Sequence, residues 1–201
     1  QPFRGRSQQD WYRGTADALY QNRAFIQDSK CDALLILSGD HIYKQDYRDL
    51  LRFHQSKNAD LTVAVMNVSP QDVSRFGIMT VDSTQKITKF AEKPKKSDST
   101  LASMGIYVFN TRFLLEQLDL DATLPDSAHD FGKNIIPRIV DMGRAFAYPF
   151  VGYWVDVGTI QAYWETSMAL LEEEPALDLY NSDWIIHTRS EERPPVKIMP
   201  P

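Results

Sequence analysis

Two aspartates stand where they could hold a metal ion together. Asp40 closely follows the apolar run at residues 34–37, and Asp156 lies in the apolar segment 153–157. If both segments are strands of one sheet, the carboxylates leave it at its ligand-binding edge, where Mg²⁺ would accept a few carboxylates and phosphate oxygens. Asp is also a common turn residue, so either aspartate could serve only to form the turn after its strand. The local pattern leaves both interpretations open.

Two further segments carry groups that suit phosphates. Residues 13–17 (RGTAD) open a predicted helix, and the N–H groups at a helix start favour phosphates or base edges. Lys93 follows Glu92 at the end of a predicted strand, where its ammonium group is a point charge for a phosphate. Ordinary helix capping and a solvated turn are the alternatives for these two segments.

Several other chemistries lack their sequence signatures. The chain contains no G-x-G-x-x-G, G-K-[ST] or G-x-S-x-G motif, which disfavours dinucleotide, P-loop and serine-hydrolase sites. Residues 130–132 (DFG) match the metal-binding triplet of kinases, but the other kinase motifs are absent. The four histidines are scattered without the spacing of metal ligands: His41, His54, His129 and His187.

The elements that must position these groups alternate between strands and helices. Apolar runs predict strands at residues 34–37, 61–68, 76–81, 86–90, 103–110, 145–150 and 153–157. Helical periodicity and caps predict helices at about 16–28, from 46, from 111, at 131–142 and at 159–173. The expected N-caps are Thr15, Asp46, Thr111 and Thr159.

The order of these elements predicts an α/β fold. The first strand, a helix and the strand 61–68 predict a right-handed crossover between two parallel strands. The strands at 76–81 and 86–90 flank a short polar loop and predict an antiparallel insertion. Pro137 predicts a later start or a kink in the helix at 131–142, and Gly143 predicts its end. We therefore expect a mostly parallel mixed sheet with flanking helices.

Composition narrows the classes of partner and compartment. The 201 residues carry a net charge of −5 with a pI near 5.4, which argues against a nucleic-acid binder. No apolar run reaches the length of a membrane span, so we expect no membrane partner and no signal peptide. The single Cys31 excludes an internal disulfide and predicts a cytoplasmic protein. Beyond residue 174 the periodicity fades and prolines accumulate, which predicts a linker.

Seven motifs together resemble the ADP-glucose pyrophosphorylase family, the glucose-1-phosphate adenylyltransferases. They are WYRGTADAL (11–19), LSGDHIYKQDY (37–47), RFGIMTVD (75–82), FAEKP (90–94), SMGIYVF (103–109), HDFGKNIIP (129–137) and WVDVGTIQAYW (154–164). They occur in the family's order and cover nearly the whole chain. The G-D and E-K-P elements are shared by all sugar-nucleotide pyrophosphorylases, whereas the longer motifs favour the ADP-glucose branch.

The resemblance implies a reaction and assigns residues to it. ATP and α-D-glucose 1-phosphate would give ADP-glucose and pyrophosphate for glycogen or starch synthesis, on a Rossmann-like fold of the nucleotidyltransferase type. The implied catalytic residues are Asp40, Lys93 and Asp156, with Mg²⁺ held by Asp40 and Asp156. The implied nucleotide-binding residues are Gly14, Thr15, Ala16 and Asp17, and the implied sugar-phosphate ligands are Tyr12, Gly77, Glu92, Lys93, Ser103 and Asp130.

The resemblance also sets expectations for the whole protein. The family's glycine-rich phosphate loop and its C-terminal β-helix domain do not occur in this sequence, so we expect the isolated chain to be inactive. Residues 1–174 would form part of the catalytic domain, residues 175–201 a linker, and the full-length protein an allosteric homotetramer. Two alternatives remain open: an enzyme that uses UTP, dTTP or GTP, and a noncatalytic regulatory subunit of the same fold.

Overall fold

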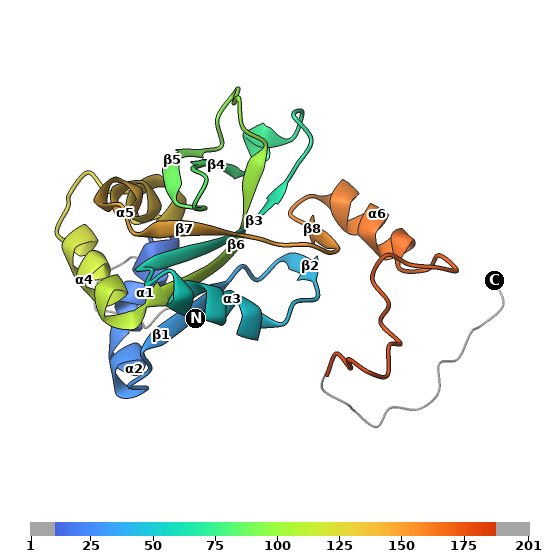
Figure 1. Ribbon diagram of the computed structural model, residues 1–201, viewed down its shortest axis with the longest axis horizontal. Coiled ribbons are helices and arrows are strands. Elements are labelled where there is room, and N and C mark those ends of the chain that lie inside the picture. Colours follow the sequence, from blue (N-terminus) through green and yellow to red (C-terminus); the bar gives the residue numbers. More distant parts are fainter. Residues whose placement is uncertain (1–10, 188–201) are drawn as a thin grey trace. The chain divides into compact units, whose positions relative to one another are not determined.

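The computed structural model describes residues 11–187, which fall into two units (Figure 1). The first unit contains residues 11–40 and 45–152, and the second contains residues 41–44 and 153–187. No helix in the described part of the chain is both long and apolar enough to cross a membrane.

The sheet of the first unit is organised around the long strand β6 (Leu101–Asn110). Strand β3 (Leu61–Asn67) pairs antiparallel along one edge of β6. The other edge is shared, because β4 (Gly77–Val81) pairs with the start of β6 and β1 (Ala33–Leu37) pairs with its end, both antiparallel. Two outer strands complete the sheet: β5 (Ile87–Glu92), antiparallel to β4, and β7 (Ala145–Pro149), parallel to β3.

This topology confirms the α/β class and the antiparallel insertion, and it corrects one predicted pairing. Strands β1, β3, β4 and β7 run in one direction, while β5 and β6 run in the other. The predicted direct parallel pair between the first strand and 61–68 is wrong, since β6 lies between β1 and β3. The strand–helix–strand order correctly predicts that β1 and β3 run in the same direction, but their adjacency depends on β6, which comes much later in the chain.

Helices of the first unit cover the sheet and share its core. They are α1 (Thr15–Gln21), α2 (Arg23–Asp28), α3 (Tyr47–Ser56), the single turn η1 (Val73–Arg75), α4 (Thr111–Ala122), the π-helix η2 (Phe131–Ile135) and α5 (Ile136–Met142). One core cluster joins buried side chains from α1, α4, η2 and α5 to those of the strands, including Val63, Phe109, Leu114 and Ile135. Burying each large side chain of this kind stabilises the fold by about 1.5–3 kcal/mol.

The start of the first predicted helix differs from the prediction. The expected helix at 16–28 is two helices that meet at Asn22. Thr15 is not the N-cap; Gly14 is, and it makes no side-chain capping bond. The hydroxyl of Thr15 donates instead to Asp130 Oδ2, at 3.0 Å, and accepts from the N–H of Phe131, also at 3.0 Å. The Thr15 hydroxyl, which was expected to cap the helix, therefore bonds to residues 130–131, far away in the sequence.

Of the next two predicted caps, one is correct and one is shifted by a residue. Asp46 caps α3 by accepting from the N–H of Arg48 at 2.9 Å, as predicted. At α4 the N-cap is Asn110 rather than Thr111, which is already the first helical residue.

The long helix predicted at 131–142 changes form at Ile136. The π-helix η2 precedes α5, and Pro137 lies in the first turn of α5, where its missing N–H is tolerated. Gly143 ends α5 in the left-handed conformation, with φ of +86°, as predicted.

The second unit is small. Strands β2 (His41–Tyr43) and β8 (Trp154–Asp156) form a two-stranded antiparallel sheet. The expectation that Asp40 and Asp156 leave strands of one sheet is therefore wrong, since Asp40 follows β1 and Asp156 ends β8. Helix α6 (Ile160–Ala169) is capped by Thr159, as predicted, and ends before the predicted 173. Residues 175–187 contain neither helix nor strand; the rest of the predicted linker lies outside the described residues.

Candidate functional site

The β2–β8 ladder places His41 directly opposite Asp156. Residues that face each other across two strands present their side chains on the same face. The imidazole of His41 packs edge-on against the indole of Trp154, with ring centroids 5.0 Å apart and an interplanar angle of 79°. The peptide bond from Asp40 to His41 brings the Asp40 carboxylate to the start of the same short ladder.

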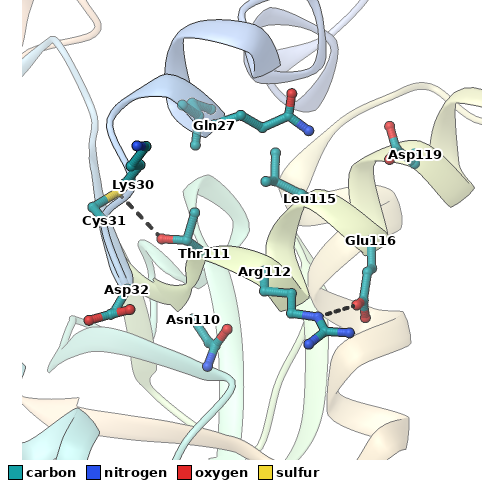
Figure 2. Close-up of a pocket in the computed structure, with 11 residues that line it drawn as sticks. Gln27, Lys30, Cys31, Asp32, Asn110, Thr111, Arg112, Leu115, Glu116 and Asp119 are labelled. Atoms are coloured by element: carbon teal, nitrogen blue, oxygen red, sulfur yellow. Dashed lines mark hydrogen bonds and ion pairs between the residues drawn. The ribbon is translucent and has the colours of Figure 1, made fainter.

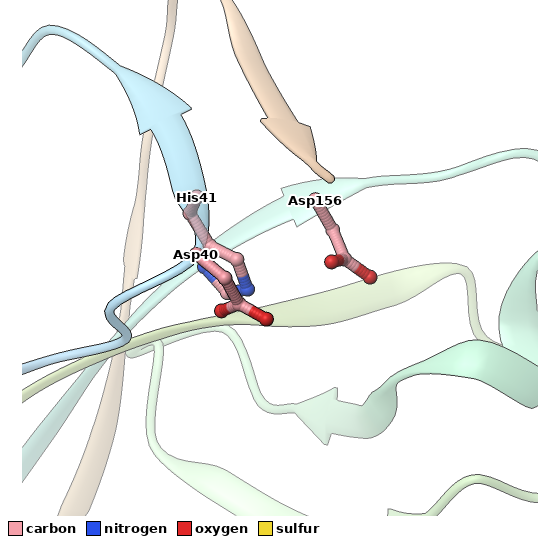
Figure 3. Close-up of side chains that lie close together, drawn as sticks. All are labelled: Asp40, His41 and Asp156. Carbon is pink, nitrogen blue, oxygen red and sulfur yellow. The ribbon is translucent and has the colours of Figure 1, made fainter. Parts of the chain in front are cut away.

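Asp40, His41 and Asp156 form a group that could hold a metal ion (Figure 3). One ligand atom from each side chain lies within 4.8 Å of the other two. Ligands of one Mg²⁺ at about 2.1 Å lie at most about 4.2 Å apart, so small side-chain rotations would complete the coordination. Two carboxylates and an imidazole are a suitable donor set for a divalent cation.

Hydrogen bonds from neighbouring residues orient both carboxylates. Ser38 Oγ donates to Asp40 Oδ1 at 2.9 Å, and the N–H of Gly158 donates to Asp156 Oδ1 at 2.9 Å. Hydrogen bonds from such neighbours to the ligating groups commonly hold metal ligands in position.

Sequence reasoning missed His41. The four histidines lack metal-ligand spacing among themselves, but His41 lies beside two aspartates. The available signal was its position next to Asp40. The other half of the group depends on the β2–β8 register, which joins residues far apart in the chain.

The predicted nucleotide segment packs against the segment around His129. The backbone N–H groups of Ala16 and Asp17 donate to the carbonyl oxygen of His129, at 2.9 and 3.2 Å. These two groups at the start of α1 were expected to be available to a phosphate or a base edge. In the structure a protein carbonyl accepts from both.

Gly14 makes the closest approach in this segment. A Cβ atom on Gly14 would lie 2.5 Å from the carbonyl oxygen of Ala128 and closer still to that of His129. Both neighbours are backbone atoms, which cannot rotate away as a side chain would. Only glycine fits the gap without a shift of the chain.

The side chains of Asp17 and Tyr12 also make hydrogen bonds within the protein. The Asp17 carboxylate is buried, at 2% exposed, and accepts from the N–H of Arg13 at 2.8 Å and from Gln21 Nε2 at 3.0 Å. The Tyr12 hydroxyl accepts from Asn22 Nδ2 at 3.2 Å. Asp17 thereby tethers the residue before Gly14 to helix α1.

Among the predicted sugar-phosphate residues, Glu92 and Gly77 lie together. They are partners in the β4–β5 ladder, and a Cβ on Gly77 would lie 3.0 Å from Glu92 Oε2. A Cβ on Gly132 would overlap the same oxygen and lie 2.7 Å from Glu92 Cδ. Burial raises the pKa of Glu92; Lys93 lowers it and Asp130 raises it further. Gly132 thus makes room for a carboxyl group that is partly withdrawn from water, whereas Gly77 makes room first for the ring of Phe90, 2.6 Å from the added Cβ.

Lys93 follows directly in an unusual backbone conformation. Its φ is +46°, a left-handed value that is unfavourable for a residue with a Cβ. Its N–H donates to the carbonyl of Phe76 at 3.0 Å, which holds the turn, and its side chain is exposed. Strained positions of this type often occur at functional sites.

Ser103 and Asp130 make specific bonds. The Ser103 hydroxyl donates to the Tyr107 hydroxyl at 3.4 Å and accepts from the N–H of Gly105 at 3.2 Å. Burial raises the pKa of Tyr107 to about 12, so its phenol keeps its proton at neutral pH. The Asp130 carboxylate caps η2 through the N–H of Lys133, at 3.0 Å, and also accepts from Thr15.

The structure thus brings predicted residues together in three places: Asp40 with Asp156, Thr15 with Asp130, and Gly77 with Glu92.

A surface cavity of about 650 Å³ lies elsewhere in the first unit, between the end of α2 and helix α4 (Figure 2). Cys31 and Thr111 line it, with their sulfur and hydroxyl oxygen 3.5 Å apart. None of the predicted site residues lines this cavity.

Comparison with known proteins gives a consistent family. Residues 5–173 match the nucleotidyl transferase family. A glucose-1-phosphate adenylyltransferase of Clostridium novyi (strain NT) is 51% identical over 187 residues, which cover 92% of this chain and 49% of the relative. Proteins of the same name from Thermotoga maritima and Clostridium acetobutylicum are 47% and 49% identical, and cover 99% and 96% of this chain and 48% and 51% of the relatives.

The chain spans about half the length of the curated relatives that it matches. The names of these relatives confirm the resemblance read from the motifs. The family match covers most of the chain, from before the RGTAD segment to the end of α6. The chain therefore belongs to the nucleotidyl transferase family.

Proposed function

We propose that the protein containing this chain transfers an adenylyl group from ATP to α-D-glucose 1-phosphate and releases pyrophosphate. The observation that carries the proposal is the meeting of Asp40 and Asp156, with ligand atoms within 4.8 Å. Relatives at about half identity are named for this activity, and they match nearly the whole chain. The product, ADP-glucose, would serve glycogen or starch synthesis.

Asp40 and Asp156 would hold the divalent cation, which we take to be Mg²⁺. The imidazole of His41 lies beside them, and because Mg²⁺ prefers oxygen ligands, the two carboxylates would hold it. A bound cation neutralises charge on the phosphate oxygens during transfer. Ser38 and Gly158 keep the two carboxylates turned to receive it.

The other residues bind and orient the substrates. Lys93 would pair with the phosphate of the sugar, because its ammonium group is exposed at the end of β5. The sugar would bind to Tyr12, Gly77, Glu92, Ser103 and Asp130, and the nucleotide to Gly14, Thr15, Ala16 and Asp17. Placing both substrates in line lowers the barrier without a covalent intermediate on the protein.

In this reaction an oxygen of the sugar phosphate attacks the α-phosphorus of ATP. The bond from the α-phosphorus to the bridging oxygen breaks, and pyrophosphate leaves with the electron pair. All bonds that form and break belong to ATP and glucose 1-phosphate, so the protein needs no nucleophile. The protein contributes by positioning the two substrates and by stabilising the charge that develops on the phosphates.

The proposal extends to the organisation of the whole protein. Residues 1–174 would form part of a catalytic domain, and residues 175–201 would lead to a further domain. The relatives are about twice as long as this chain, which leaves room for such a domain. We further propose a cytoplasmic homotetramer under allosteric control.

The test is pyrophosphate release by the full-length protein with glucose 1-phosphate and each of ATP, UTP, dTTP and GTP. We expect ATP to be used and Asp40→Asn to abolish release. The exposed Asp126→Asn is the matched control and should retain activity. Preference for another nucleotide would support the sister activity instead. If Asp40→Asn were as active as the wild type, the metal-binding role would be refuted.

A further inference from the structure

His129 has an unfavourable backbone and a buried side chain. Its φ is +51°, in the left-handed region that a residue with a Cβ rarely adopts. Its side chain is only 4% exposed. Such a conformation persists where the surroundings impose it, and these positions concentrate at functional sites.

A buried hydrogen-bond network imposes this conformation. His129 Nδ1 donates to Asp121 Oδ2 at 2.8 Å, and Asp121 in helix α4 is 2% exposed. Ser127 Oγ donates to Asp121 Oδ1 at 2.8 Å and accepts from the N–H of His129 at 3.0 Å. Arg138 lies 3.9 Å from the same carboxylate. The side chain and the backbone of His129 are thus both tied to one buried carboxylate.

The network fixes the carbonyl that meets helix α1. His129 O accepts from both Ala16 and Asp17, in the segment proposed to bind the nucleotide. The next residue, Asp130, accepts from the Thr15 hydroxyl at 3.0 Å and is proposed to bind the sugar. His129 and Asp130 together therefore join the two proposed substrate segments through hydrogen bonds.

We propose that the buried His129–Asp121 pair is a positioning element that couples the nucleotide segment to the sugar segment. The pair holds residues 129–130, and these residues place Asp130 against Thr15. A nucleotide that shifts residues 14–17 then also shifts Asp130 through the Thr15 bond, so binding of one substrate changes the affinity for the other. This inference rests on the proposed function, because it assigns a coupling to the same site.

Coupling can be measured apart from stability and from turnover. Coupling between two ligands is reciprocal: each changes the affinity of the other by the same factor, here called the coupling factor. A residue that only stabilises the fold lowers the melting temperature and leaves this factor unchanged in the folded protein. A residue that positions the two segments against each other changes the factor itself.

The experiment is calorimetric titration of the full-length protein with the unreactive analogue α,β-methylene-ATP in the presence of Mg²⁺. Its dissociation constant is measured with and without saturating glucose 1-phosphate, and the titration is then reversed. For the wild type we expect each ligand to change the dissociation constant of the other by a factor of at least about 5. His129→Asn tolerates the left-handed backbone, and Asp121→Asn keeps the volume; both should bring the factor to about 1.

A matched control and a milder variant separate coupling from folding. His54 is also buried, at 5% exposed, and its Nδ1 bonds to Thr62 Oγ1 at 2.8 Å, away from both segments. His54→Asn should lower the melting temperature and keep the wild-type factor. Thr15→Val removes the hydroxyl that bonds to Asp130 without touching the buried network, and it should also bring the factor to about 1.

The outcomes distinguish the two levels of proposal. If the wild type binds neither the analogue nor glucose 1-phosphate, the proposed function fails. If it binds both, but folded Thr15→Val and Asp121→Asn keep the wild-type factor, or the wild type shows none, only the coupling role is refuted.

Discussion

Replacing Gly14 by alanine tests the close approach between residues 14–17 and the segment at His129. The backbone of Gly14 is extended, with φ of −168° and ψ of −179°, which alanine adopts without strain. The added Cβ would lie 2.5 Å from the carbonyl oxygen of Ala128. The effect of Gly14→Ala is therefore steric and local.

The size of the effect follows from the overlap. Nonbonded heavy atoms rest at about 3.5 Å, so the two segments must separate by roughly 1 Å. That shift would break the bonds from Ala16 and Asp17 to the His129 carbonyl, each contributing about 1 kcal/mol. A loss of about 2 kcal/mol corresponds to a fall in Tm of about 4–8 °C for a domain of this size. A 1 Å displacement of substrate-positioning residues costs about 100-fold in activity.

The assay combines thermal unfolding with kcat/KM for pyrophosphate release by the full-length protein. Gly39→Ala is the stability control, because no atom lies within 4 Å of its added Cβ. We expect Gly39→Ala to keep or slightly raise the Tm. If Gly14→Ala matched the wild type in both Tm and kcat/KM, the contact would be shown to carry neither stability nor position.

Three further predictions concern single groups. Ser38→Ala removes the bond to Asp40 Oδ1 and should weaken Mg²⁺ affinity, measured calorimetrically, by at least about tenfold; unchanged affinity would contradict the orienting role. Burial raises the pKa of Glu92 above its ordinary 4.5. As pH rises from 4.5 through the raised pKa, Glu92 ionises more readily in the unfolded state, so the folded protein loses stability. Glu92→Gln should therefore raise Tm at about pH 7 and by less at about pH 4, whereas an equal gain at both would contradict this. Hydrogen bonds from Ser29 and then Thr111 lower the pKa of Cys31, so Ser29→Ala should move its alkylation by iodoacetamide to higher pH; an unmoved profile would refute that cause.

Local features of the fold could be predicted because their causes are local. A helix cap bonds to groups two or three residues away, so Asp46 and Thr159 were identified correctly. Gly143 ended its helix as expected, since a left-handed residue is needed there. Buried strands were equally visible as apolar runs.

The candidate site was only partly accessible to the same reasoning. The apolar segments beside Asp40 and Asp156 indicate these two residues, and the family motifs indicate the others. The strand pairing that brings His41 to Asp156 was not foreseen, because register is set between segments distant in the chain. The local sequence predicts a capping role for the Thr15 hydroxyl, because its actual partner Asp130 lies far away in sequence.

The sequence by itself determined the α/β class, most of the elements and the family. These follow from periodicity, short-range capping and motif order. Tertiary structure alone decided that β6 separates β1 from β3, that His41 joins the two aspartates, and that a strained His129 holds helix α1. Each of these depends on contacts between residues far apart in the chain, whose free energies appear only when the whole sheet and its buried polar groups are assembled.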